Sequence, residues 1–285
     1  MKKQKFTPGL CAVYFFLSAW AITTIYPFIW VILNSFRVKN EIRTDSFSIP
    51  MGDSFSLENF EAAFSTMDVG KAYLNSIIIS ISVTMAVIVL AGFASFAIVR
   101  YHFPGKKFLL GAIIASMMIP GFATIVPVFR MEAAWGLAGT RDIWKSMIAT
   151  ILPQIAGNLS FATMVLMGFM RSLPIGTEES AFLDGCNVYQ IYFKIVMPMA
   201  RPSFATVSIF AFLWSYNDLF TQSFFLRIPG SETVTLLLNQ ISSQAGTNYG
   251  KMAASVVIVV IPVVIVYIFL QKNIIKGMTA GAIKG

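Results

Sequence analysis

The amino-acid sequence predicts an all-α membrane protein that crosses the bilayer six times, as a single transmembrane domain over residues 1–285. Of these residues 56% are hydrophobic and only 12% are charged, whereas an ordinary soluble domain is roughly 25% charged. A chain with so few charges cannot cover itself with a polar surface of ordinary density. Uncharged stretches also recur along the chain at lengths that suit membrane helices rather than soluble core helices. Lipid is therefore the expected solvent.

The positions of the spans follow from six stretches without Asp, Glu, Lys or Arg. A helix rises about 1.5 Å per residue, so about 20 residues cross a hydrocarbon core roughly 30 Å thick. The fifth stretch reaches this length only if Asp218 is included, because apolar residues resume up to Leu226. The expected spans cover residues 10–36, 73–99, 108–130, 147–170, 203–226 and 252–271.

The distribution of basic residues sets the expected orientation. A formal charge of +8 would suit a nucleic-acid-binding protein, but Lys and Arg in short loops between spans govern membrane topology. With six spans and the N-terminus inside, 12 of the 21 basic residues and only 3 of the 13 acidic residues fall on the cytoplasmic side. Both termini are expected to be cytoplasmic. The expected cytoplasmic loop covers 171–202, and the outer loops cover 37–71, 131–146 and 228–250.

The loop at 171–202 has the pattern of two short helices rather than of a plain connector. Thr177 is expected to cap the first helix. The first turn of this helix carries Glu178 and Glu179, which places negative charge at the positive end of its dipole. Gly185 suits the left-handed residue that ends the helix after about two turns.

The second helix of this loop has an amphipathic pattern. Asn187 followed by Gln190 forms a capping-box-like start, and Pro198 and Pro202 end the helix before the next span. The apolar residues on one stripe of the helix are Val188, Ile191, Tyr192, Ile195 and Val196. Two short rigid helices joined at a glycine are well suited to pass a push from a soluble partner to the spans.

This loop resembles the EAA signature of permeases in binding-protein-dependent ATP-binding-cassette (ABC) importers. The family pattern is Glu-Ala-Ala, three residues, Gly, nine residues and Ile-x-Leu-Pro, and Ser180 and Met197 are departures of similar size. The matching segments are Glu179-Ser180-Ala181, Gly185 and Ile195-Val196-Met197-Pro198.

Two further segments resemble the carbohydrate class of this family, specifically the smaller maltose-type permease. Trp214-Ser215-Tyr216-Asn217-Asp218 is similar to a Trp-Asn-Asp segment in the fifth span of that group, with extra residues between Trp and Asn. The basic, glycine-rich tail from Lys276 to Gly285 is similar to the tail of the same group. The resemblance therefore extends over nearly the whole chain.

The resemblance implies the type I fold of an ABC importer permease, in the cell membrane of a bacterium or archaeon. It implies a second related permease, two ATPase subunits and an extracytoplasmic solute-binding protein as partners, and a sugar or oligosaccharide as substrate. The ATPase subunits would bind ATP and magnesium, so this chain would carry no cofactor of its own. Nucleic acid is not an expected partner.

The same resemblance implies roles for individual residues. The loop would dock as a coupling helix into a groove on an ATPase, and the tail would contact the same partner. The implied coupling residues are Glu178, Glu179, Ser180, Ala181, Asp184, Gly185, Ile195 and Pro198, and the implied tail contacts are Thr279, Ala280 and Gly281. For Asn217 and Asp218 two roles stay open, a contact with the pore and a structural bond to neighbouring backbone.

Other classes of function fit the residues less well. The chain lacks the Gly-x-x-x-x-Gly-Lys-Ser/Thr stretch of phosphate-binding ATPases, and its expected spans lack the residue sets of an intramembrane enzyme. No catalytic or metal site is therefore expected. An ion-coupled secondary carrier would need ionisable residues near the middle of the membrane, whereas Asp218 is expected near its outer end. Transport of a polyol or a sugar phosphate is an alternative to transport of a sugar.

Overall fold

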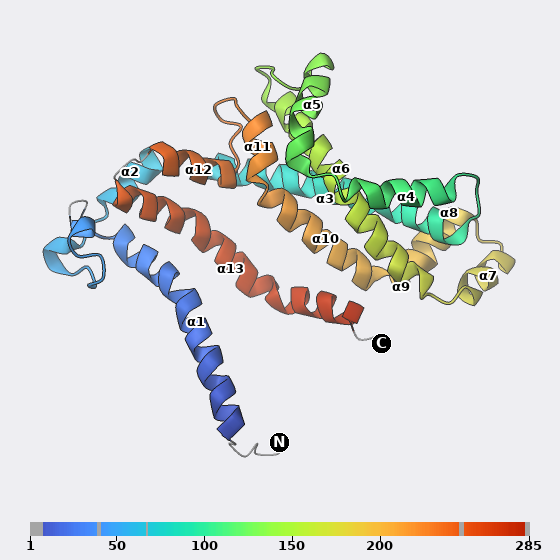
Figure 1. Ribbon diagram of the computed structural model, residues 1–285, viewed down its shortest axis with the longest axis horizontal. Coiled ribbons are helices and arrows are strands. Elements are labelled where there is room, and N and C mark those ends of the chain that lie inside the picture. Colours follow the sequence, from blue (N-terminus) through green and yellow to red (C-terminus); the bar gives the residue numbers. More distant parts are fainter. Residues whose placement is uncertain (1–7, 39–40, 67, 245–247, 283–285) are drawn as a thin grey trace. The chain divides into compact units, whose positions relative to one another are not determined.

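The computed structural model of this chain describes residues 8–38, 41–66, 68–244 and 248–282, and the regular elements in these ranges are helices (Figure 1). The chain divides into two compact units. The first unit comprises residues 1–69 and 238–265, and the second comprises residues 70–237 and 266–285.

The first unit begins with α1 (Pro8–Ser35), a helix of 28 mainly apolar residues. Side chains from residue 11 to residue 29 are exposed, whereas Asn34 and Ser35 at the end of the helix are buried. An apolar helix that is exposed all round suits lipid rather than water. The other elements of this unit are two 3₁₀ turns (Glu41–Arg43 and Gly52–Ser54), α2 (Glu58–Thr66), the end of α12 (Val234–Gln244) and the start of α13 (Tyr249–Ala282).

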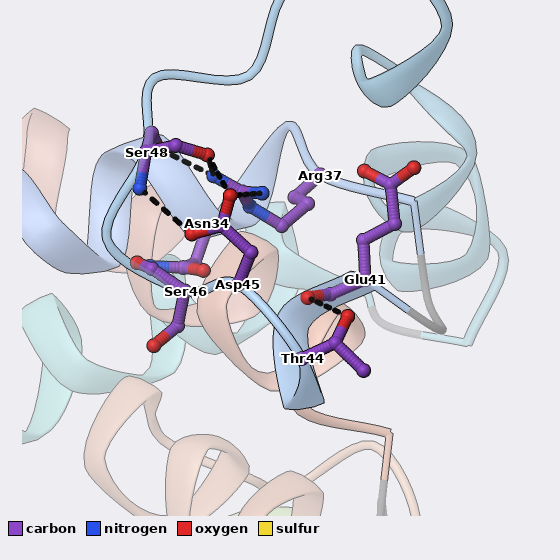
Figure 2. A network of polar contacts seen from close by, with 7 residues as sticks. All are labelled: Asn34, Arg37, Glu41, Thr44, Asp45, Ser46 and Ser48. Carbon is purple, nitrogen blue, oxygen red and sulfur yellow. Dashed lines mark hydrogen bonds and ion pairs between the residues drawn. The ribbon is translucent and has the colours of Figure 1, made fainter.

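A polar cluster folds the segment after α1 back onto the end of that helix (Figure 2). Arg37 is only 1% exposed. Its guanidinium donates to the Ser48 carbonyl and, over 2.9 Å, to the Ser48 hydroxyl, and it lies 3.9 Å from the carboxylate of Asp45. The side-chain amide of Asn34 donates to the Ser46 carbonyl over 3.0 Å. Because a buried guanidinium needs polar partners, these bonds fix the path of the loop.

Hydrogen bonds at Asp45 favour the charged form of its carboxyl group. The Ser48 hydroxyl donates to one carboxylate oxygen over 2.5 Å, and the Ser48 amide donates to the other over 3.2 Å. These bonds hold the pKa of Asp45 below its ordinary value of 3.8, and the charge of Arg37 makes a smaller contribution in the same direction. Since the folded state has the lower pKa, this contribution to stability is present above the ordinary pKa and is lost as the pH falls through the depressed value.

Replacing Ser48 with Ala should raise the pKa of Asp45 toward its ordinary value, because the hydroxyl donor is lost. An NMR titration of protein labelled with ¹³C at aspartate carboxyl carbons measures this shift. Ser46→Ala is the matched control, since Ser46 contributes its backbone carbonyl to the cluster, and it should leave the titration unchanged. An unshifted midpoint in Ser48→Ala would contradict the assigned cause.

The second unit holds the remaining helices. The first four are α3 (Val69–Arg100), α4 (Lys106–Ser116), α5 (Gly121–Ala134) and α6 (Ile143–Arg171). The next six are α7 (Gly176–Leu183), α8 (Val188–Ile191), a π-helix (Tyr192–Val196), α9 (Met197–Met199), α10 (Arg201–Tyr216) and α11 (Leu219–Phe225). The start of α12 and the end of α13 complete the unit.

The core of the second unit lies among α3, α6 and α10. Its buried apolar residues include Ile79, Val83 and Val87 of α3, Leu166 and Met170 of α6, and Val207 and Ala211 of α10. The Ser95 hydroxyl of α3 donates to the Thr163 carbonyl of α6 over 3.0 Å. Small polar residues let membrane helices approach closely, so this contact suits packing within a bilayer.

Within the described ranges, α1, α3 and α6 are each long and apolar enough to cross a membrane. Two bent pairs pass the same test together: α4 with α5, at an angle of 106°, and the segment Val188–Met199 with α10, at 79°. The apolar part of α13, Tyr249–Ile265, is shorter. By length and composition these residues supply three to five spans, and six spans with both termini cytoplasmic stay a prediction.

The span expected over residues 108–130 is divided into two helices (Figure 1). α4 ends at Ser116, and α5 begins at Gly121 in a different direction. Pro120 lies directly before α5. Proline has no backbone N–H and disfavours helical geometry in the residue before it, which accounts for the break at this point.

The span expected over residues 203–226 is also divided. α10 ends at Tyr216, and the side-chain amide of Asn217 donates to the Leu213 carbonyl over 2.8 Å. α11 then begins after Asp218, whose carboxylate accepts a bond from the Thr221 amide over 3.0 Å. The Asp218 carboxylate thus satisfies an N–H group in the first turn of α11 that has no helical partner, whereas Asn217 adds a second bond to a carbonyl that already accepts from its own backbone N–H.

Candidate functional site

α7, the first short helix of the polar loop, begins at Gly176 without a side-chain cap. The expectation that Thr177 caps this helix is wrong, because the Thr177 hydroxyl donates to the Pro174 carbonyl over 3.0 Å. Thr177 already lies inside the helix, where its side chain reaches back to a carbonyl instead of to the free N–H groups ahead. Glu178 and Glu179 lie in the first turn as expected, at the positive end of the dipole.

The glycine that ends α7 has the expected conformation. Gly185 has a φ of +83°, in the left-handed region that favours glycine. Its N–H donates to the Phe182 carbonyl and the Cys186 N–H donates to the Ala181 carbonyl, each over 3.0 Å. This pair of bonds is a Schellman motif, which closes the helix and turns the chain sharply toward α8.

The predicted second helix of the loop is confirmed at its start, but its later course differs from the prediction. Asn187 and Gln190 form the expected capping box, with reciprocal side-chain to backbone bonds of 2.9 Å. After α8 the chain widens into the π-helix Tyr192–Val196 and then α9, and it turns at Ala200 into α10. Pro198 therefore lies inside a helical stretch rather than after its end.

Apolar contacts hold this loop against the core of the second unit. Ala181 of α7, Ile191 of α8 and Tyr192 and Val196 of the π-helix are buried in that core. Tyr192 stacks on Phe93 of α3 with ring centroids 4.7 Å apart. The loop is therefore packed directly onto a long helix of the bundle.

An ion pair joins α7 to the last residue of α3. Arg100 Nε donates to Glu178 Oε1 over 2.8 Å and to Oε2 over 3.0 Å, and Arg100 Nη2 lies 2.6 Å from Oε1. Both side chains are only 11% exposed, so water and salt screen the pair little. Because one N–H group of Arg100 contacts both carboxylate oxygens, the attraction has a defined direction. The loop motif did not point to Arg100, although a basic residue at the end of a neighbouring span was an available signal.

The other side of α7 is open. We call its exposed residues Glu179, Ser180, Phe182, Leu183 and Asp184 the α7 face. Phe182 and Leu183 are 67% and 87% exposed. Large apolar side chains beside carboxylates, on a helix that is fixed from behind, are suited to contact another protein.

A second polar cluster surrounds the break between α10 and α11. The Gln154 side-chain amide donates to Asp218 over 3.0 Å, and the Ser215 hydroxyl donates to Gln154 Oε1 over 2.6 Å. The Gln222 side-chain amide donates to the Ser215 carbonyl over 2.9 Å, and the Thr233 hydroxyl donates to Gln222 Oε1. Asp218 therefore caps α11 and also bonds to Gln154 of α6, which lies too far along the chain for a local motif to indicate it.

A comparison with protein families matches residues 87–280 to the binding-protein-dependent transport system inner membrane component. The chain belongs to this family. The matched residues include the end of α3, the whole polar loop and both helix breaks.

Several relatives of this inner membrane component are similar over most of their length. The diacetylchitobiose uptake system permease protein of Streptomyces coelicolor is 30% identical, over 94% of this chain and 87% of that protein. The trehalose transport system permease protein of Mycobacterium tuberculosis is 30% identical, over 92% of this chain and 93% of that protein. The galactooligosaccharides transport system permease protein of Bacillus subtilis is 30% identical, over 95% of this chain and 94% of that protein.

A solved structure shares the fold of this inner membrane component. It belongs to a bacterial ABC transporter involved in the import of the acidic polysaccharide alginate. The TM-score is 0.76 at 19% identity, over 95% of this chain and 99% of that one. At this identity the likeness shows the fold alone.

The structure separates the signature residues of this inner membrane component into two groups. Glu178 and Ala181 face the bundle, whereas Glu179, Ser180, Asp184, Gly185 and Pro198 are exposed and Ile195 is half-buried. Thr279, Ala280 and Gly281 lie in the last turns of α13, where only the backbone is described.

Replacing either Arg100 or Glu178 with Gln should destabilise the protein by about 2 kcal/mol, because the other charge is left buried without its partner. The double variant should be more stable than the sum of the single effects predicts, by about 1–2 kcal/mol. Thermal unfolding of the purified protein in detergent measures this cycle. Glu179→Gln, which removes the neighbouring exposed carboxylate, is the control and should change stability by less than about 0.5 kcal/mol. Additive single effects would show that the pair is not coupled.

Proposed function

We propose that this chain is one permease subunit of an ATP-driven importer for a sugar or oligosaccharide, which an extracytoplasmic binding protein delivers. Membership of the binding-protein-dependent family supports the transport class. Relatives whose names specify diacetylchitobiose, trehalose and galactooligosaccharides support a saccharide as the substrate. The observation that carries the mechanism is α7, a short helix bound to the bundle on one side and exposed on the other.

The proposed complex contains this chain, a second related permease, two ATPase subunits and the binding protein. A solved structure of a bacterial alginate ABC transporter in complex with an alginate pentasaccharide-bound periplasmic protein supports this kind of assembly. Its fold matches this chain with a TM-score of 0.64 at 17% identity. The ATPase subunits bind ATP and magnesium and carry out hydrolysis. This chain supplies the path through the membrane and uses no cofactor of its own.

The geometry of the loop suggests how motion passes from the ATPases to the spans. The α7 face docks on an ATPase, with Glu179 and Asp184 supplying charge and Phe182 and Leu183 supplying apolar contact. When ATP binding brings the ATPases together, α7 moves with its partner as a rigid body. The Glu178–Arg100 pair passes this displacement to α3.

A second connection leads from the same loop to α10. Gly185 sets the angle between α7 and α8, and the helical stretch through Ile195 and Pro198 continues to the start of α10. Displacement of α3 and α10 together changes which side of the membrane the path opens to. The tail residues Thr279, Ala280 and Gly281 provide an additional contact with the same ATPase.

Reconstitution tests this proposal directly. Proteoliposomes that contain the permease pair and the ATPases should take up a saccharide only when the loaded binding protein is outside and ATP is inside. Uptake driven by a proton gradient without ATPase subunits would overturn the proposal.

Replacing Gly185 with Val should uncouple the complex, because a β-branched residue cannot hold the left-handed conformation that directs α8. We expect uptake to fall by about tenfold or more, while the protein stays inserted and the ATPases keep their basal activity. Gly105→Val is the matched control, since Gly105 has the same φ of +83° and open space around it but lies before α4. Equal loss of uptake in both variants would show that backbone strain, not the position in the coupling loop, is responsible.

The proposed orientation places 171–202 on the cytoplasmic side of the plasma membrane. A membrane-impermeant maleimide should therefore label Cys186 in inside-out vesicles and not in intact cells, as read by peptide mass spectrometry. Arg141→Cys, an exposed position in the expected outer loop, should show the opposite pattern. Labelling of Cys186 in intact cells would contradict this topology.

A further inference from the structure

A cavity of about 520 Å³ opens in the second unit where the two helix breaks approach α6. Ser116 and Gly121 line it from the break between α4 and α5, and Asp218 and Thr221 line it from the break between α10 and α11. Gly157 of α6 forms part of the wall between them. The volume falls within the range of roughly 300–1,000 Å³ that is typical of pockets for small ligands.

Both breaks fall inside spans expected from the sequence, at 108–130 and 203–226. Non-helical backbone at membrane depth is tolerated only where it is buried in protein or lines a space that holds water. Here both interrupted helices place their breaks at the same cavity. A water-filled path, a polar cargo or a side chain of another subunit can therefore occupy it.

The lining combines hydrogen-bonding groups with aromatic rings. Its polar side chains belong to Ser116, Thr124, Thr221 and Asp218, and its aromatic rings belong to Phe122 and Phe220. The Ser116 and Thr124 hydroxyls donate to the Ile113 and Gly121 carbonyls over 2.8 Å and 3.0 Å, so their oxygens offer acceptor positions to the hydroxyl groups of a sugar. The rings offer apolar surfaces for the C–H faces of a sugar, and a few polar groups on an apolar wall are the usual composition of a ligand site.

Asp218 is held in a fixed position at this cavity. One of its oxygens accepts from the Thr221 amide and the other from the side chain of Gln154, each over 3.0 Å. Gln154 is itself fixed by the buried Ser215. A carboxylate has about four acceptor positions, so about two remain for donors within the cavity. A fixed acceptor loses little entropy when a ligand binds.

The charge of the lining selects between classes of saccharide. Asp218 is the single charged residue among the lining residues that the structure describes, and it is acidic. A uronic acid or a sugar phosphate would bring a second negative charge to this carboxylate, which is unfavourable at short range. A neutral saccharide meets no such penalty.

We propose that this cavity is a contact site for a neutral saccharide on its path through this subunit, with the fixed Asp218 carboxylate and the hydroxyls of Ser116, Thr124 and Thr221 as hydrogen-bonding partners. This proposal rests on the proposed function of sugar import and adds a place and a substrate class to it. The carboxylate therefore has two roles, because it caps α11 and also faces the cavity.

Filling the cavity tests the proposal. A Cβ atom at Gly157 would meet no heavy atom within 4 Å, so Gly157→Leu should fold and place its side chain in the open space. The probes are diacetylchitobiose, trehalose, maltotriose and trigalacturonate, each with the complex and its binding protein in proteoliposomes. Whichever neutral sugar the wild type takes up should enter about tenfold more slowly in Gly157→Leu. If the wild type took up trigalacturonate and none of the three neutral sugars, the assignment to neutral saccharides would be overturned.

Gly168→Leu is the matched control on the same helix. Gly168 is also exposed, and a Cβ atom there would likewise meet no heavy atom within 4 Å, but Gly168 does not line the cavity. The rate of sugar uptake by the Gly168→Leu complex should stay within about twofold of the wild-type rate. Equal uptake by Gly157→Leu and the wild type would overturn the contact site and leave the proposed function intact. Saccharide uptake by the wild type that needs neither ATP nor the binding protein would overturn the proposed function itself.

Labelling separates contact with the sugar from contact with the second permease. In Gly157→Cys, a small polar methanethiosulfonate reagent should label residue 157 in the assembled complex, as read by peptide mass spectrometry. The transported sugar, delivered by its binding protein to the vanadate-trapped complex, should slow this labelling by about fivefold or more, and it should leave Gly168→Cys unaffected. A residue 157 that is unreactive with and without sugar would show that another subunit fills the cavity, and labelling that is insensitive to sugar would equally overturn the proposal.

Discussion

In the hydrocarbon core of a bilayer, every backbone N–H and C=O group must find a partner inside the protein. Long helices meet this demand within themselves, which is why the apolar parts of this chain fold as helices. The two breaks do not, and the residues around them show how the demand is met. After α10, the Asp218 carboxylate accepts a bond from the Thr221 amide, which has no helical partner at the start of α11. Buried side chains such as Gln154 then satisfy the carboxylate in turn.

The polar loop meets this demand differently, because water can bond to the polar groups on its exposed side. Its helices are too short to be stable alone, so their ends are closed by a Schellman motif at Gly185 and a capping box at Asn187. Contacts of Tyr192 with α3, and of Arg100 with Glu178, then fix the loop on the bundle. Adjacent glutamates therefore have different surroundings: Glu178 is paired and mostly buried, whereas Glu179 is exposed. This division lets one short helix hold the bundle and present a free face.

Local patterns predicted the features that depend on neighbouring residues. The left-handed Gly185 and the reciprocal bonds of Asn187 and Gln190 involve atoms within a few residues, so their spacing in the chain was sufficient. Thr177 shows the limit of such reasoning, because a shift of the helix start changes which group its hydroxyl reaches. The break after Ser116 shows a similar limit. Pro120 removes a backbone donor, but whether a helix bends or stops there depends on the partners available to the freed backbone groups.

The sequence by itself determined that this chain has apolar stretches of the length that membrane helices need, and which loop carries the permease signature. These properties follow from composition, from stretches without charge and from residues at fixed spacing, all of which act over short distances along the chain. Only the tertiary structure decided that Arg100 pairs with Glu178, that Gln154 holds Asp218, and that two helix breaks meet at one cavity. Those contacts join residues far apart in the chain, and their formation depends on how helices pack, which no local pattern specifies.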